Sequence, residues 1–159
     1  MSILREYQTE MGRLIDAYQG TLERYAGDAM MVFFNDPVPM PNHAEQAVRL
    51  AVAMRSRFAE LHMSWSKRGF DIGVGLGLAT GFATIGVIGS EGRLDYAAIG
   101  TVTNLAARLC SEALNGQILI SGRILTLVEP LVRTEALGAL TLKGIHRPVD
   151  TYNVTGFKK

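Results

Sequence analysis

The sequence of 159 residues predicts an α+β domain built on an antiparallel-rich sheet with helices on one face. Two observations lead to this class. Helix-like and strand-like stretches follow one another as helix, hairpin, helix, hairpin, helix and strand, and several strand-like stretches are continuous apolar runs typical of a sheet interior. This order is that of a ferredoxin-like sandwich, with residues 30–34 and 72–78 expected at the centre of its sheet. A chain of this length can bury roughly 70% of its unfolded surface, so we predict one domain over 1–159.

The first third of the chain predicts a helix followed by a hairpin. Apolar residues recur at helical spacing from Ile3 to Tyr18, and Gly20 can end this helix. Residues 21–25 and 30–34 then favour two strands joined by a tight turn at Gly27-Asp28.

A long amphipathic helix is expected next, over residues 44–67, after a proline-stiffened loop. Strands over 70–79 and 82–89 follow, and we interpret them as a buried hairpin that turns at 79–81. The uncharged run over residues 72–90 is as long as a membrane span, but its many glycines argue against a spanning helix.

Glycines 73, 75 and 77 have the spacing of part of a dinucleotide-binding fingerprint. They lie inside a predicted strand rather than between a strand and a helix, so we reject that function for them. We interpret them as places where a helix approaches the sheet closely.

The remainder of the chain predicts a helix that starts at Gly100-Thr101, followed by shorter elements. These are a strand over 117–120, a helix over 122–128 and weaker strands over 132–137, 140–143 and 151–154.

Charge and cysteine content limit the possible partners. The chain has sixteen Lys and Arg and fifteen Asp and Glu, scattered along it, which gives a net charge of +1 and no basic stripe for nucleic acid. Its single cysteine, Cys110, forms no internal disulfide, which favours a reducing compartment and a cytoplasmic location. Charged residues from Arg5 onward interrupt any signal-peptide core, and we expect no membrane segment.

The helix after Gly100 carries the most informative chemistry. Asn104 and Arg108 are four residues apart and therefore share one helical face, while the opposite face is apolar. An amide can orient a sugar and a guanidinium can bind phosphate. Two alternatives stay open: Arg108 pairs with Glu112, and Asn104 caps the helix start locally.

Four separated segments, in this order and at these intervals, resemble the catalytic domain of the class III nucleotidyl cyclases, the adenylyl and guanylyl cyclases. They are residues 24–33 (RYAGDAMMVF), 79–81 with 86–90 (ATG and GVIGS), 96–109 (YAAIGTVTNLAARL) and 142–144 (LKG). The resemblance extends over nearly the whole chain and implies conversion of ATP or GTP to a 3′,5′-cyclic nucleotide and pyrophosphate.

The resemblance assigns roles residue by residue. Asp28 matches the second of two aspartates that bind two Mg²⁺ or Mn²⁺ ions, Asn104 the residue that orients the ribose, and Arg108 the residue that stabilises charge on the α-phosphate. Lys143 matches the lysine directed toward the terminal phosphates. Composition alone favours an ordinary turn residue for Asp28, and a solvated turn lysine is the alternative interpretation of Lys143. The resemblance also implies a head-to-tail homodimer in which each site combines residues of both chains.

Two positions depart from the family pattern. The positions that read the purine carry Arg24 and Ala97 in place of the lysine and aspartate of adenylyl cyclases, and Arg24 also differs from the glutamate of guanylyl cyclases. The choice between ATP and GTP therefore stays open.

The family's first strand and first metal-binding segment have no match in this chain, whose resemblance starts at the helix that follows them. Neighbouring strands would then lack hydrogen-bond partners unless another segment or a second copy filled the place. We therefore expect weak or absent turnover from these residues alone, and a longer parent protein with an upstream regulatory domain. The alternative function is a degenerate cyclase-homology domain that dimerises or binds nucleotide without turnover. A diguanylate cyclase is excluded because its Gly-Gly-Asp/Glu-Glu-Phe turn is missing.

Overall fold

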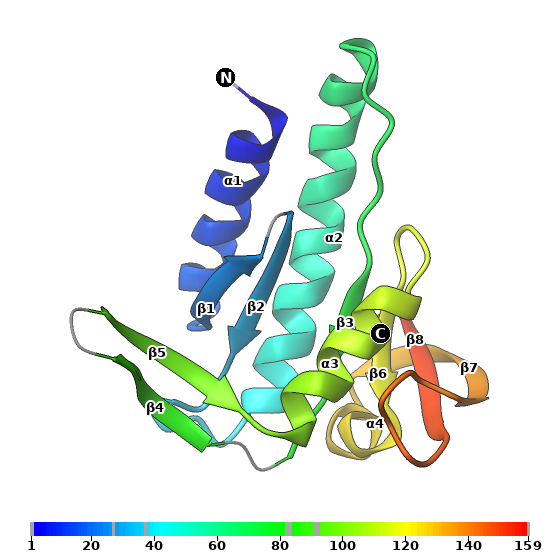
Figure 1. The fold of residues 1–159 in the computed structure, drawn as a ribbon. Helices are drawn as coiled ribbons and strands as arrows, with labels where there is room; N and C mark the ends of the chain where they lie inside the picture. The colour runs from blue at the N-terminus through cyan, green and yellow to red at the C-terminus, as the bar shows by residue number, and fades with distance from the viewer. Residues whose placement is uncertain (1, 27, 37, 82–83, 91–92, 159) are drawn as a thin grey trace.

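The computed structural model describes residues 2–26, 28–36, 38–81, 84–90 and 93–158, with Ala26 and residues 84–90 and 93–99 described by their backbone only (Figure 1). Their elements follow one another as α1 (Ile3–Ala17), β1 (Thr21–Ala26), β2 (Ala29–Phe33), α2 (His43–Lys67), β3 (Leu76–Leu78), β4 (Thr84–Ser90), β5 (Arg93–Ile99), α3 (Thr101–Glu112), β6 (Ile118–Ser121), α4 (Gly122–Val128), β7 (Val132–Leu140) and β8 (Val149–Phe157).

The predicted N-terminal helix and hairpin are confirmed. Ser2 caps α1 by accepting a hydrogen bond from the Arg5 amide at 3.2 Å, and α1 ends at Ala17, just before the predicted stop. Strands β1 and β2 are antiparallel, with Thr21 opposite Phe33, and residue 27 of the predicted turn lies outside the described residues.

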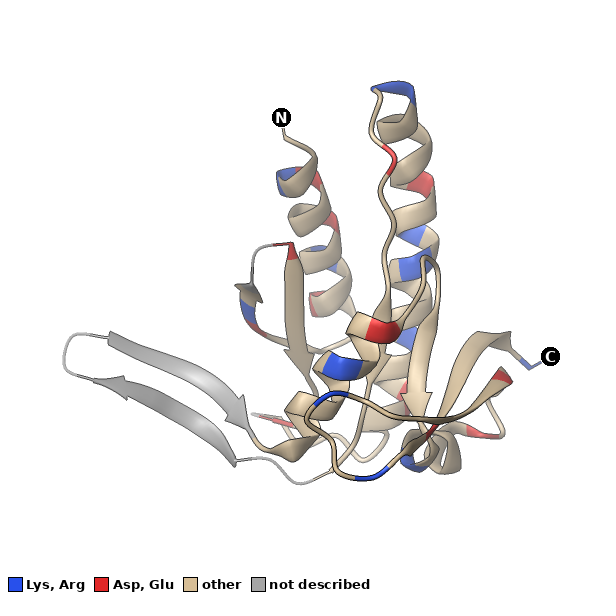
Figure 2. Cartoon of the chain, turned by 45° about the vertical axis from the view of Figure 1, so that its right-hand side comes forward, with Lys and Arg blue, Asp and Glu red and all other residues tan. Residues whose placement is uncertain are grey.

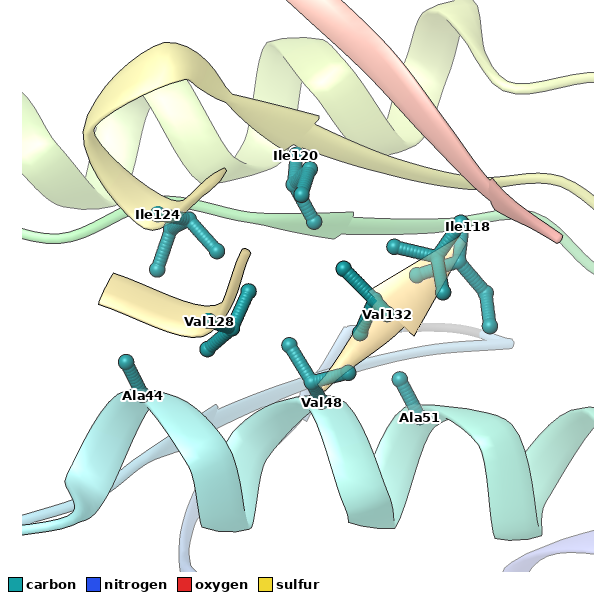
Figure 3. Close-up of a cluster of buried hydrophobic side chains, with 9 residues drawn as sticks. Ala44, Val48, Ala51, Ile118, Ile120, Ile124, Val128 and Val132 are labelled. Atoms are coloured by element: carbon teal, nitrogen blue, oxygen red, sulfur yellow. The ribbon is translucent and has the colours of Figure 1, made fainter. Parts of the chain in front are cut away.

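Helix α2 supplies one wall of the main core. Its buried residues Ala44, Val48 and Ala51 face the sheet, α4 and the start of β7, as Figure 3 shows. The other members of this cluster are apolar residues of β6, α4, β7 and β8, namely Ile118, Ile120, Ile124, Val128, Val132 and Val154. Burial of such side chains stabilises the fold by roughly 1.5–3 kcal/mol each.

The described strands form three separate sheets rather than one. The largest has the order β3-β6-β8-β7, in which β3 and β6 are parallel and the other pairs antiparallel. Strands β1 and β2 form a two-stranded sheet, and so do β4 and β5. Helices together with mainly antiparallel sheets confirm the predicted α+β class.

Three predictions about individual strands are wrong. The predicted hairpin over 72–90 does not form, because β3 pairs with β6 and β4 pairs with β5. The predicted strand over 70–79 is reduced to β3, since β6 offers a partner to only three of its residues. The predicted strand over 140–143 is the end of β7 and a turn.

The prediction of helices on one face only is also wrong. Leu76 and Leu78 of β3 pack against the cluster that contains α2, whereas Gly77 between them lies against α3. Alternate residues of a strand point to opposite faces, so α2 and α3 cover the two sides of β3.

Residues 30–34 and 72–78 were expected at the centre of the sheet, and this prediction fails for the described chain. Both β2 and β3 are edge strands, because no described strand lies between them. Both strands nevertheless pack against the same buried cluster of α1 and α2, through Met30 and Val32 of β2 and Leu76 of β3.

None of the described helices is long and apolar enough to cross a membrane.

Candidate functional site

Helix α3 presents both of its predicted site residues to solvent. The helix starts at Gly100, whose carbonyl oxygen accepts a hydrogen bond of 2.7 Å from the Thr103 hydroxyl. Asn104 and Arg108 are exposed on its outer face, whereas Leu109 is fully buried. The division into a polar and an apolar face is therefore confirmed.

The inner face of α3 rests on the backbone of β3. A Cβ atom added to Gly77 would lie 2.3 Å from the Cys110 amide nitrogen and 2.5 Å from the Ala106 carbonyl oxygen. At Gly75 an added Cβ would lie 2.8 Å from the Cβ of Ala113. These glycines let helix and strand approach more closely than any side chain allows, as the sequence predicts for them.

The two outer side chains of α3 are not engaged by the described chain. Arg108 forms no ion pair there, so its predicted alternative pairing with Glu112 is not made. The amide of Asn104 makes no hydrogen bond to a described residue, and no side chain caps the start of α3, so the predicted local cap by Asn104 is not made. Both groups keep their hydrogen-bonding capacity for a ligand.

Lys143 lies in the turn between β7 and β8, and its neighbour Leu142 places this turn beside α3. Leu142 is only 2% exposed and belongs to the same buried cluster as Leu109, the residue that follows Arg108. Gly144 closes the turn with φ +81°. Figure 2 shows basic positions on α3 and on the adjoining loop between β7 and β8. The sequence pattern identifies Lys143 as a site residue, but it does not show that burial of Leu142 holds Lys143 in place.

Asp28 follows the tip of the β1–β2 hairpin and is exposed. Its charge acts on one residue of α1 and one of α3, where it raises the pKa of each. Burial, and then the charges of Cys110, Asp28 and Tyr25, raise the pKa of Tyr7 to about 12. Burial first and Asp28 second raise the pKa of the Cys110 thiol. Sequence patterns do not predict these two electrostatic interactions, because Tyr7, Asp28 and Cys110 lie far apart along the chain.

The donor chemistry at Asp28 fits Mg²⁺ or Mn²⁺ only as part of a ligand set. An exposed carboxylate is a hard oxygen ligand, and Mg²⁺ is commonly held by one or two carboxylates with water and phosphate oxygens. Among the described residues, no group of three or more His, Cys, Asp or Glu could hold a metal ion. Further ligands would have to come from a bound triphosphate or from another segment.

The purine-specifying positions lie on two hairpins. Arg24 is on β1 opposite Met31; its side chain is 70% exposed, and its Nε atom lies 3.6 Å from the Glu23 carboxylate. The backbone of Ala97 pairs with Gly86 in β5, and its side chain lies outside the described part of the structure.

The best-defined hollows of the surface lie away from these residues. One of about 410 Å³ is lined by α4, β7 and β8, including Leu125 and Thr155. Another of about 220 Å³ lies between α2 and the segment before β3, at Phe58 and Val74. Neither of these two hollows is lined by Asp28, Asn104 or Arg108, which are all exposed.

Comparison with known proteins identifies the family. Residues 1–156 match the family described as the adenylate and guanylate cyclase catalytic domain, and the chain belongs to this family. It is 30% identical to adenylate cyclase 1 of Rhizobium meliloti (strain 1021) over 161 aligned positions, which cover 98% of this chain and 24% of that protein. The resemblance and the fold class inferred from the sequence are thereby confirmed.

Solved cyclase structures have the same fold. The adenylyl cyclase CyaB of P. aeruginosa matches with a TM-score of 0.92 and 34% identity, covering 98% of this chain and 82% of that one. The guanylate cyclase domain of RhGC from Catenaria anguillulae, solved in complex with GTP, matches with a TM-score of 0.86 and 26% identity over 98% and 82% of the two chains. The chain thus spans about a quarter of the curated relative, and roughly four fifths of these solved domains.

Proposed function

We propose that this domain takes part in the conversion of ATP or GTP to a 3′,5′-cyclic nucleotide and pyrophosphate. The observation that carries the proposal is the unengaged pair Asn104 and Arg108 on the outer face of α3, with the Lys143 turn anchored beside it. Family membership supports the reaction class, and a related domain was solved in complex with GTP.

Each proposed role follows from the side chain. The O3′ oxygen of the ribose forms a bond to the α-phosphorus, the bond from that phosphorus to the pyrophosphate oxygen breaks, and the hydroxyl proton passes to solvent. Asn104 would orient the ribose through directional hydrogen bonds, and Arg108 would stabilise charge that grows on the α-phosphate. Lys143 would bind the terminal phosphates as a point charge.

Asp28 would hold a divalent cation through its exposed carboxylate, with Mg²⁺ or Mn²⁺ as the cation. Such an ion, when bound, lowers the pKa of the attacking hydroxyl and neutralises the triphosphate.

We also propose that two copies pair head to tail, so that Asp28 of one chain faces Asn104 and Arg108 of the other. The exposure of these residues supports a site completed by a second chain. A two-fold axis would create two such sites at once.

The second candidate function is nucleotide binding without turnover. The substitutions at Arg24 and Ala97 favour this alternative.

A fluorescence titration with N-methylanthraniloyl derivatives of ATP and GTP, in the presence of Mn²⁺, tests the binding role. Arg108→Ala and Asn104→Ala are expected to weaken binding at least tenfold, whereas Arg5→Ala, which removes an exposed arginine from α1, should leave it unchanged. Binding that ignores both α3 substitutions, or no binding at all, would refute the proposal. Chromatographic detection then separates the two functions: cyclic product supports the cyclase, and nucleotide binding without cyclic product supports the non-catalytic alternative.

A further inference from the structure

The hollow between α2 and the segment before β3 combines apolar walls with a polar rim. Phe58 and Ala59 line it from α2, and Ile72 and Val74 line it from the segment before β3. Its volume is about 220 Å³, below the roughly 300–1,000 Å³ of sites for drug-sized ligands. Ile72 is 39% exposed, so the hollow is open to solvent. It has room for a small organic molecule.

Arg55 brings a positive charge to this hollow without a carboxylate partner. Its Nη1 atom donates to the carbonyl oxygens of Val154 at 2.7 Å and Gly116 at 3.3 Å, and its Nη2 atom donates to that of Thr155 at 3.3 Å. It forms no ion pair with a described residue. A guanidinium has five N–H groups, so the one on Nε and one on Nη2 stay available. Burial lowers the pKa of Arg55, because its charge is partly removed from water.

Asn115, which also lines the hollow, adds a second donor. Its Oδ1 atom accepts a hydrogen bond from the Val74 amide at 3.0 Å, whereas its Nδ2 group makes no hydrogen bond to a described residue. A Cβ atom added to Gly73 would lie 2.6 Å from the Cγ and Oδ1 atoms of Asn115, so glycine at this position makes room for the amide. Because Oδ1 is engaged, the free end of the amide is a hydrogen-bond donor.

His62 completes the polar rim. Its Nε2 atom lies 3.3 Å from the Asp71 carboxylate, and its Nδ1 atom, which makes no hydrogen bond to a described residue, can donate when the imidazole is protonated. The carbonyl oxygens of Val74 and Gly116 already accept hydrogen bonds, from the Gly116 amide and from Arg55. No Asp or Glu is among the described residues that line the hollow. The hollow thus offers donors and a positive charge between apolar walls.

We propose that this hollow binds a small organic carboxylate, whose charged group is held by Arg55 and Asn115 and whose apolar body lies between Phe58 and Ile72. Guanidinium groups bind carboxylates through charge-assisted hydrogen bonds, and removal of the apolar body from water adds to the affinity. A neutral ligand would leave the charge of Arg55 without a partner, and inorganic phosphate would gain nothing from the apolar walls. The site shares no residue with the proposed nucleotide site, so the proposal goes beyond the proposed function.

Titration with benzoate, followed by amide chemical shifts in nuclear magnetic resonance spectra, tests the proposal without nucleotide. Benzoate carries a carboxylate on an apolar ring, benzamide has a similar shape without the charge, and acetate has the charge without the ring. We expect saturable shifts at the amides of residues 72–74 and 115–117, with benzoate binding at least tenfold more tightly than benzamide or acetate. This comparison of ligands needs only the unsubstituted chain, and its result is independent of cyclase activity.

Asn115→Asp is the sharpest variant, because the new side chain keeps an oxygen for the Val74 amide but replaces the free donor by a negative charge. It should weaken benzoate binding at least tenfold, since the added carboxylate repels the ligand and competes for Arg55. Asn35→Asp is the matched control: Asn35 is also exposed, its Oδ1 atom also accepts a backbone hydrogen bond, from Met40, and it does not line the hollow. This control should bind benzoate as the unsubstituted chain does. Amide signals from β7 report that both variants are folded.

Equal affinity for benzoate and benzamide would overturn the proposal, because the charge would then not be recognised. Equal affinity for benzoate and acetate, or displacement of benzoate by an equal concentration of inorganic phosphate, would overturn it as well, since the apolar walls would then play no part. Shifts that never saturate, or benzoate binding that is unchanged in Asn115→Asp, would show that the hollow is not the binding site.

Discussion

Replacement of Gly77 by alanine is expected to displace the helix that carries Asn104 and Arg108. The added Cβ would lie 2.3 Å from the Cys110 amide nitrogen, and ordinary contact starts at 3.4 Å, so α3 and β3 must separate by about 1.1 Å. Both atoms that are met belong to the backbone of α3. Truncation of the Cys110 or Ala106 side chain therefore cannot relieve the clash.

The expected loss has two parts. Overpacking of this kind destabilises a fold by about 1–3 kcal/mol, which urea unfolding followed by circular dichroism can measure. A displacement of about 1 Å in a catalytic group can lower a reaction rate by roughly 10²-fold, and we expect binding of the fluorescent nucleotides to weaken in the same direction.

Gly156→Ala is the matched control, because Gly156 is a strand glycine of β8 at which a Cβ meets nothing within 4 Å. A second comparison uses Gly75→Ala, where the Cβ of Ala113 lies at 2.8 Å. Adding Ala113→Gly should restore part of the stability there. If Gly77→Ala unfolds at the same urea concentration as the unsubstituted chain and binds nucleotide equally well, the close approach does not position α3 and the reasoning is refuted.

Three further substitutions test other contacts. Arg55→Ala should lower the free energy of unfolding by about 2 kcal/mol in urea, because the guanidinium donates to the Val154 carbonyl at 2.7 Å; an unchanged midpoint would contradict this. Glu6→Gln should lower the free energy of unfolding above pH 4.5 and leave it unchanged in strong acid. Hydrogen bonds from Trp65 and then Arg68 lower the pKa of Glu6, and stability that comes from a lowered carboxyl pKa is lost as the pH falls through that pKa. Parallel curves of stability against pH for the two proteins would argue against the contact. Gly144→Ala should cost about 1–2 kcal/mol by thermal unfolding, since its φ of +81° disfavours a side chain, and a melting temperature equal to that of the parent would be inconsistent with this geometry.

Local patterns in the sequence were sufficient to predict features that depend on residues within a single helix or strand. The apolar spacing in α1 and α2 predicts both helices nearly to their ends, because a helix face is set by residues three and four apart. The outward direction of Asn104 and Arg108 follows from the same rule. The close approach at Gly75 and Gly77 was also predictable, since glycine inside an apolar strand signals a near neighbour.

Pairing between strands could not be predicted in this way. The segments at 70–79 and 82–89 look like a hairpin because they are adjacent in sequence and equally apolar. Their actual partners, β6 and β5, are chosen by which edges meet after the helices have packed. Hydrogen-bond capacity is the same in every strand, so sequence alone does not identify the partner.

By itself the sequence determined the helices, the β1–β2 hairpin, the family and the residue types that suit a nucleoside triphosphate. Only the tertiary structure decided that α2 and α3 cover opposite sides of β3 and that Leu142 holds the Lys143 turn beside Leu109. It also decided that β2 and β3 pack against the same buried cluster of α1 and α2. The reason is physical: periodicity is a property of neighbours along the chain, whereas these arrangements depend on burial between segments that are far apart in it.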